Sequence, residues 1–138
     1  MNEKIPLLSS SDLIEKAKTV LNPRQLYLGN RAGDVACALL SAQGNLYLGV
    51  CMDISSGIGF CAEHSAIAAM ITASETAIAQ VVAISGDGKV LPPCGRCREL
   101  MYEIDPSNLK TTDVILGEDQ AVKLIDLLPH PYHEVWEE

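Results

Sequence analysis

The chain has 138 residues, 48% of them hydrophobic and 20% charged, and a formal net charge of -8 at pH 7. This length and hydrophobic content suit one buried core, so we expect residues 1–138 to form a single domain. The acidic balance argues against nucleic acid as a partner, because phosphate contacts need clustered lysine and arginine. The sequence lacks a signal-like N-terminus and any apolar stretch near the roughly 20 residues that cross a bilayer, which predicts a cytoplasmic protein without membrane contact.

The first third of the chain carries a helix pattern and then a hairpin pattern. Apolar residues repeat at helical spacing over residues 10–21, and Asn22-Pro23 ends the repeat. Residues 34–41 and 46–51 read as two strands, because they flank a turn signal around Gly44. We therefore expect one helix followed by one antiparallel strand pair.

The remaining residues alternate between strand and helix patterns. We expect a glycine- and serine-rich loop over 53–60, a buried helix over 62–74, a strand over 81–85, a turn over 86–88, a helix over 94–104, a strand over 113–116 and a helix over 119–128. Strands interleaved with helices after an initial hairpin predict an α/β fold, namely a three-layer α/β/α sandwich around a mixed sheet.

The five cysteines point to metal rather than to disulfides. Their odd number and the CxxC spacing of Cys94 and Cys97 favour reduced thiols. Cys37 and Cys51 lie outside any motif, and we expect both to be small apolar core residues.

Two short motifs carry the chemistry. Cys61-Ala62-Glu63 and the run Pro93-Cys94-Gly95-Arg96-Cys97 together supply three thiolates and one carboxylate. Three protein ligands leave a tetrahedral Zn²⁺ one open position, which is typical of a catalytic site and not of a structural one. Glu63 lies too close to the first ligand to be a fourth, so we expect it to move protons to and from a water on the metal.

The sequence resembles the cytidine deaminase superfamily, and within it the blasticidin S deaminases, through residues 91–99 (LPPCGRCRE). Residues 35–40 with the glycines that follow them, and residues 127–129 with Tyr132, are similar to the family's first hairpin and C-terminal end. The resemblance implies zinc-dependent hydrolytic deamination of the cytosine ring of a small nucleoside or nucleoside antibiotic. It also implies a homotetramer whose pockets are completed across subunit interfaces.

The expected mechanism gives one carboxylate two tasks. Glu63 takes a proton from zinc-bound water and later passes protons to the ring nitrogen and to the departing ammonia. Its pKa should therefore lie closer to neutrality than about 4.3, with burial as the cause.

The negative charge of three thiolates on one zinc ion must be offset by neighbouring hydrogen-bond donors. Zinc with three thiolates carries a net charge of about -1, which disfavours acidification of a bound water. His64, Arg96 and Arg98 are the nearest candidates to withdraw that charge. The resembling family often has arginine directly after its catalytic glutamate, where this chain has His64.

Substrate contacts are expected at both ends of the chain. Ala62 lies beside Glu63, Arg96 lies within the second motif, and Asp53 follows the second strand. The resemblance implies that Tyr132 and Trp136 close the pocket, although Trp136 would serve equally to anchor the tail to the core.

Recognition of ribose is expected to be weak. Where cytidine deaminases carry an Asn-x-Glu pair that binds ribose, this chain has Cys51-Met52-Asp53, and Gly33-Asp34 replaces an aromatic residue before the first strand. A cationic amino or guanidino tail on the substrate would pair with Asp53 instead.

Three other interpretations compete with this one. A closed structural zinc would use the three cysteines and His64. For the individual residues Arg96 and Arg98, the alternative role is that of ordinary solvated charges. A catalytically silent zinc-binding protein would recognise a base-like ligand without turnover. A nucleic-acid editor is disfavoured by the acidic charge and by the lack of a basic, aromatic strand-binding stretch.

Overall fold

The computed structural model describes residues 7–135 as five helices, one 3₁₀ turn and a seven-stranded sheet. The helices are α1 (Ser10–Lys18), α2 (Ala62–Thr72), α3 (Gly95–Ile104), α4 (Asn108–Thr111) and α5 (Leu124–Leu127), and the turn is η1 (Ser55–Gly57). The strands are β1 (Arg24–Gln25), β2 (Arg31–Ser41), β3 (Leu46–Asp53), β4 (Ile78–Ser85), β5 (Val90–Leu91), β6 (Asp113–Gly117) and β7 (Gln120–Lys123).

The sheet is mixed. Strand β2 pairs antiparallel with β1, β3 and β4, whereas β4 and β6 pair in parallel and β6 and β7 pair antiparallel. The short strand β5 adds to β4 directly before the second cysteine motif. The initial hairpin and the mixed sheet predicted from the sequence are therefore confirmed.

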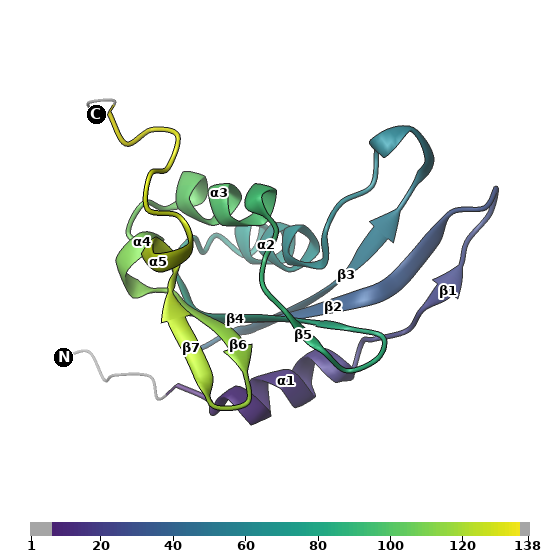
Figure 1. The fold of residues 1–138 in the computed structure, drawn as a ribbon, viewed down its shortest axis with the longest axis horizontal. Coiled ribbons are helices and arrows are strands. Elements are labelled where there is room, and N and C mark those ends of the chain that lie inside the picture. Colours follow the sequence, from purple (N-terminus) through teal and green to yellow (C-terminus); the bar gives the residue numbers. More distant parts are fainter. Residues whose placement is uncertain (1–6, 136–138) are drawn as a thin grey trace.

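Helices cover both faces of the sheet, with α1 on one side and α2 and α3 on the other (Figure 1). Strand β2 serves both faces: Cys37 and Leu39 contact the α2 and α3 layer, and Ala36 and Ala38 contact α1. Because successive strand residues point to opposite faces, an all-apolar strand can be buried on both sides. The three-layer α/β/α sandwich is confirmed.

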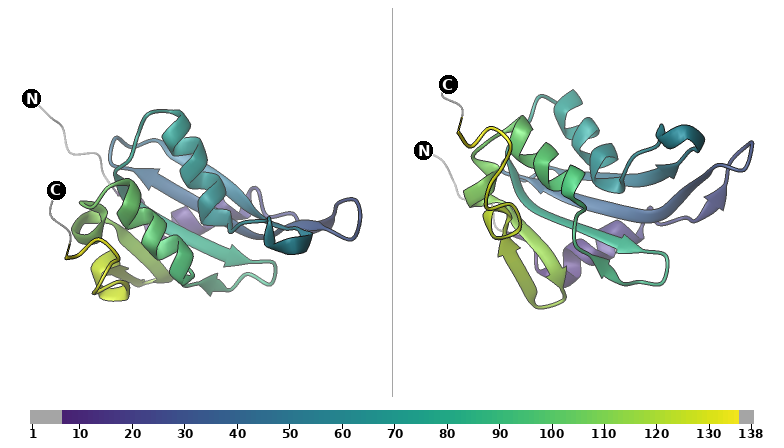
Figure 2. Two further views of the ribbon diagram at one scale, coloured as in Figure 1. Left: turned by 90° about the horizontal axis from the view of Figure 1, so that it is seen from above. Right: turned by 45° about the horizontal axis from the view of Figure 1, so that its top comes forward.

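Helices α2 and α3 lie side by side on their face of the sheet (Figure 2). Gly49 of β3 allows α2 to approach, since a Cβ built there would stand 2.4 Å from the backbone nitrogen of Ala66 and 2.7 Å from the carbonyl oxygen of Ala62. This close contact fixes the first turn of α2, which carries the first motif.

The region from 119 to 128 was wrongly predicted as one helix. Residues Gln120–Lys123 instead form the edge strand β7, and only Leu124–Leu127 is helical. The ladder to β6 and the ion pair between Lys123 and Asp113 (2.6 Å) favour the strand over the local helical preference. The two-residue strands β1 and β5 and the four-residue α4 are too short to produce a periodic pattern.

Within residues 7–135, none of the helices has the length and apolar character that a membrane span requires.

Candidate metal and active site

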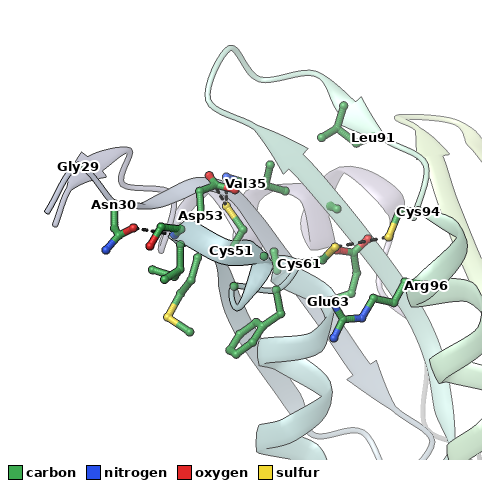
Figure 3. A pocket seen from close by; sticks show the side chains of 18 of the residues that line it. Gly29, Asn30, Val35, Cys51, Asp53, Cys61, Glu63, Leu91, Cys94 and Arg96 are labelled. Atoms are coloured by element: carbon green, nitrogen blue, oxygen red, sulfur yellow. Dashed lines mark hydrogen bonds between the residues drawn. The ribbon is translucent and has the colours of Figure 1, made fainter. Parts of the chain in front are cut away.

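The two cysteine motifs meet at the beginnings of α2 and α3. Cys61 and Cys94 are the N-cap residues of these helices, and Cys97 lies in the first turn of α3. The Sγ of Cys94 lies 3.4 Å from the Sγ of Cys61 and 3.4 Å from that of Cys97, while Cys61 and Cys97 have their sulfurs within 4.8 Å (Figure 3). Three thiols from two motifs 33 residues apart therefore converge on one point.

The spacing of the sulfurs fits a zinc ion. With Zn–S bonds of about 2.3 Å and tetrahedral angles, two thiolate ligands stand about 3.8 Å apart, close to the distances observed. Free thiols at helix N-termini also face backbone N–H groups and the positive end of the helix dipole, which favour the anionic form that a metal requires. Cys61, Cys94 and Cys97 thus form a donor set suited to zinc.

The pKa values of the three thiols shift in different directions, and burial raises that of Cys61 above its ordinary value. Burial raises the pKa of Cys97 well above its ordinary value, and the nearby Glu63 carboxylate raises it further. Burial also raises the pKa of Cys94, but hydrogen bonds from the backbone and side chain of Cys97, from the Cys61 thiol and from the backbone of Arg96 together outweigh it and leave this pKa below its ordinary value.

Glu63 lies beside the thiols in the first turn of α2. Its side chain is 4% exposed, and burial raises its pKa above the ordinary value, as expected, although its own backbone N–H and Cys97 oppose the shift. Burial thus keeps a carboxyl that can both accept and donate a proton next to the metal-binding sulfurs.

His64 also reaches the cluster. Its Nδ1 lies 3.4 Å from the Sγ of Cys97, and its ring stacks near Phe60 with the centroids 6.4 Å apart. Burial and the positive charge of Arg96 lower the pKa of His64. The imidazole is therefore neutral near pH 7 and can donate one hydrogen bond to a thiolate or offer a lone pair.

Glu63 and two of the three thiols, those of Cys61 and Cys94, form one end of a cavity of about 700 Å³, and Cys97 is buried behind them. Ala62, Arg96 and Asp53, expected to contact substrate, all line it, and Arg96 extends toward the Glu63 end (Figure 3). The other lining residues are Leu28, Gly29, Asn30, Val35, Cys51, Met52, Ile54, Ser55, Gly57, Gly59, Phe60, Ala83, Leu91 and Pro92. Cys51, expected only as core, is buried and also forms part of this wall.

Polar groups lie at the opposite end of the cavity from the thiols (Figure 3). Arg31 binds Asp34 with two hydrogen bonds of 3.0 and 2.9 Å and is also attracted by Asp53, so one cation and two carboxylates together leave a net negative charge at this end of the cavity. Asn30 accepts a hydrogen bond of 2.9 Å from the backbone N–H of Ser55 and also lines the cavity. Sequence analysis missed Asn30, since a lone asparagine before a strand carries no motif.

Two expected site residues are placed elsewhere or are not described. Tyr132 is not among the residues that line the cavity: its backbone N–H donates to Glu99 on α3, its ring lies edge-on to His133, and its side chain is 64% exposed. In the single chain Tyr132 is therefore bound through its backbone to α3 and does not line the cavity, and its expected part in closing the pocket stays a prediction. Trp136 lies outside the described residues.

Arg98 contacts main-chain carbonyls and not sulfur. Its Nε donates to the carbonyl of Pro93 at 2.8 Å, and its Nη1 donates to that of Leu127 at 3.1 Å. Two main-chain carbonyls therefore engage this guanidinium, and the expected part of Arg98 in balancing the thiolate charge stays a prediction.

Comparison with known proteins supports the earlier resemblance. No protein-family model matches the chain. Cytidine deaminase from Mycoplasma genitalium is 35% identical over 91 residues, which cover 64% of this chain and 68% of the relative. Cytidine deaminase from Halalkalibacterium halodurans is 28% identical over 97 residues, covering 69% and 74%, respectively.

Solved structures agree in fold. The crystal structure of cytidine deaminase from Mycobacterium leprae matches with a TM-score of 0.73 and 27% identity, over 89% of this chain and 99% of that chain. The enzyme from Mycobacterium tuberculosis matches with a TM-score of 0.74 and 25% identity, over 91% and 98%. With sequence and fold in agreement, the chain belongs to the cytidine deaminase family of hydrolytic deaminases.

Proposed function

We propose that this protein deaminates the cytosine ring of a small nucleoside or nucleoside antibiotic by hydrolysis and releases ammonia. The observation that carries the proposal is the placement of the buried Glu63 carboxyl beside three converging thiols at one end of a cavity. Cytidine deaminases are the chain's relatives by sequence and by structure.

Cys61, Cys94 and Cys97 would hold the zinc. When bound, zinc in such a site lowers the pKa of a water and supplies the nucleophile. Glu63 accepts a proton on the way to the transition state and returns protons to the ring nitrogen and the leaving amine. The cavity wall around Ala62 and Arg96 orients the ring so that its amino-bearing carbon faces Glu63, and burial of Glu63 keeps bulk water from its carboxyl.

The far end of the cavity would select the substituent on the ring. Asp53 forms a group there with Arg31 and Asp34, and these two carboxylates and one cation leave a net negative charge. A cavity of about 700 Å³ also exceeds the size of a bare cytosine ring. These features support a substrate with a cationic tail, of the nucleoside antibiotic kind, in preference to plain cytidine.

Ammonia release tests the activity. Zinc-loaded protein would be incubated with cytosine, cytidine, deoxycytidine and a cytosine nucleoside that carries an amino or guanidino tail. Turnover of at least one nucleoside that is lost in Glu63→Gln supports the proposal. Binding without ammonia release across the panel would support the silent zinc-binding protein instead.

Elemental analysis tests the ligand set. We expect one zinc per chain, lost when Cys94→Ala and Cys97→Ala are combined, because Cys61 alone cannot hold the ion. A matched variant is Cys37→Ala, which removes a buried thiol of the sheet that belongs to neither motif. Near-stoichiometric zinc in the double variant would exclude this set.

We further propose a cytoplasmic single-domain protein that assembles as a homotetramer. The alanine-rich helix α2 supports the assembly, because Ala68, Ala69 and Ala73 are exposed beside Ile71, while Ala66 faces the chain's own core. Small exposed side chains let helices of neighbouring copies approach closely. Light scattering at micromolar concentration should give the mass of four chains, and the mass of one chain would reject the tetramer.

A further inference from the structure

We infer that Arg98 is a positioning residue. It fixes the backbone at Cys94, and with it the direction of the Cys94 thiol, by linking this part of the metal site to the C-terminal segment. The inference rests on the proposed zinc site. It concerns how the chain holds Cys94, the most exposed of the three thiols, and it assigns Arg98 a role that differs from balancing thiolate charge.

Cys94, like Cys61, is an N-cap residue, and it depends on contacts outside its helix more than Cys97 does. Cys97 is buried within α3, whose backbone ladder fixes it, whereas Cys94 is exposed and precedes the first helical residue. The chain before it, between β5 and α3, has non-helical backbone and includes Pro92 and Pro93, which have no N–H to donate. The position of the Cys94 sulfur therefore rests on whatever holds the Pro93–Cys94 peptide unit.

Arg98 binds the carbonyl groups on either side of Cys94, one through the ordinary i to i−4 backbone bond of α3 and the other through its side chain. Its backbone N–H donates to the carbonyl of Cys94 at 3.0 Å, and its Nε donates to the carbonyl of Pro93 at 2.8 Å. Two successive carbonyls, on either side of the Cys94 Cα, are thus bound by one residue. Such a pair restricts rotation about the backbone of Cys94 and hence the direction of its Cβ–Sγ bond.

The same guanidinium reaches the C-terminal segment. Its Nη1 donates to the carbonyl of Leu127 at 3.1 Å, at the last residue of α5. The final carbonyls of a helix have no partner within the helix, so this bond satisfies a group that would otherwise lack one. Arg98 therefore links the Pro93 carbonyl to the end of α5 through one rigid planar group.

The geometry of the guanidinium distinguishes a positioning role of Arg98 from a role that depends only on its positive charge. A guanidinium presents donors in a fixed fork and can bind both carbonyls at once, whereas a lysine ammonium at the same place carries the same charge on a flexible stem. If Arg98 positions Cys94, Arg98→Lys should weaken zinc binding, because a lysine ammonium lacks the fixed fork that binds both carbonyls. If Arg98 only balances charge, Arg98→Lys should behave like the wild type.

The test measures zinc retention and backbone exchange, not activity. Zinc-loaded wild type, Arg98→Lys, Arg98→Met and the control Arg24→Met are titrated with a chromophoric chelator. Arg24 also donates to a backbone carbonyl, that of Asn22 at 3.1 Å, away from the site. Loss of groups that orient a metal ligand typically weakens binding about 10- to 100-fold, and we expect that range for Arg98→Met, at least severalfold weakening for Arg98→Lys and no change for Arg24→Met.

Hydrogen exchange in the metal-free proteins supplies the second readout. The amides of residues 94–98 should exchange faster in both Arg98 variants, while those of α2 stay as in the wild type. Should Arg98→Met fail to fold, Arg98→Lys carries the test alone. Zinc affinity and exchange equal to wild type in Arg98→Lys would overturn the positioning role, whereas a wild type that binds no zinc through Cys94 would overturn the proposed function itself.

Discussion

The Nδ1 atom of His64 lies 3.4 Å from the Sγ of Cys97, so the residue directly after Glu63 reaches the sulfur of the other motif. The described donor atoms within 4.8 Å of one another include His64 with Cys61 and Cys97 but not Cys94. A fourth ligand of a tetrahedral three-thiolate zinc would stand near all three sulfurs at once. The arrangement thus favours a neutral hydrogen-bond donor to Cys97 over a ligand that closes the site.

Replacing His64 tests that distinction. We expect His64→Ala to keep one zinc per chain and to weaken zinc binding about tenfold, the lower end of the range for a lost ligand-orienting group. The measurement is elemental analysis followed by chelator competition. Loss of stoichiometric zinc would instead identify a closed four-ligand site, and Phe60→Leu, which keeps an apolar neighbour for the His64 ring, serves as the control for packing.

Replacing Glu63 by glutamine distinguishes the role of this carboxyl in proton transfer from the role of its shape. Glu63→Gln should keep the fold and the zinc but lose ammonia release by at least about 10²- to 10⁴-fold, the usual contribution of general acid-base catalysis, because one group serves several proton transfers. Steady-state kinetics with equal zinc loading check the result. Ammonia release comparable to that of the wild type would remove Glu63 from the mechanism.

The same substitution should change the pH dependence of stability. Because burial raises the pKa of Glu63 in the folded chain, the contribution of this carboxyl to stability is complete below its unfolded pKa of about 4.3 and is lost as pH rises through the folded pKa. Metal-free Glu63→Gln should therefore match the wild type below about pH 4 and exceed its stability at pH 7. Urea unfolding across pH checks this, with the exposed Glu118→Gln as control; a variant less stable than wild type at pH 7 contradicts it.

Substrate choice should depend on Asp53. Each missing polar contact to a ribose hydroxyl costs about 1 to 3 kcal/mol, or roughly one to two decades in kcat/KM. The kcat/KM for cytidine should therefore fall below about 10⁵ M⁻¹s⁻¹. Asp53→Asn should reduce kcat/KM for a nucleoside with a cationic tail and leave that for cytidine nearly unchanged. Fast turnover of cytidine by the wild type, or an equal effect of the substitution on both substrates, would argue against tail recognition by charge.

Local patterns in the sequence were enough to predict most of the architecture. The apolar repeats of α1 and α2, the glycine turn between β2 and β3 and the helical start after each cysteine motif are short-range features. Helix caps, turn residues and periodicity act within a few positions, so they can be read without the fold. The region 119–128 failed because β7 exists only through its pairing with β6.

The sequence by itself determined the chemistry of this protein, since the spacing of Cys61, Glu63, Cys94 and Cys97 predicts a zinc-dependent deaminase before any coordinates are seen. Only the tertiary structure decided which other side chains join them. It placed Asn30 at the far end of the cavity, brought His64 to Cys97 and turned Arg98 toward the carbonyls of Pro93 and Leu127. The physical reason is that these contacts join residues far apart in the chain, through packing and hydrogen bonds that leave no periodic or motif signal.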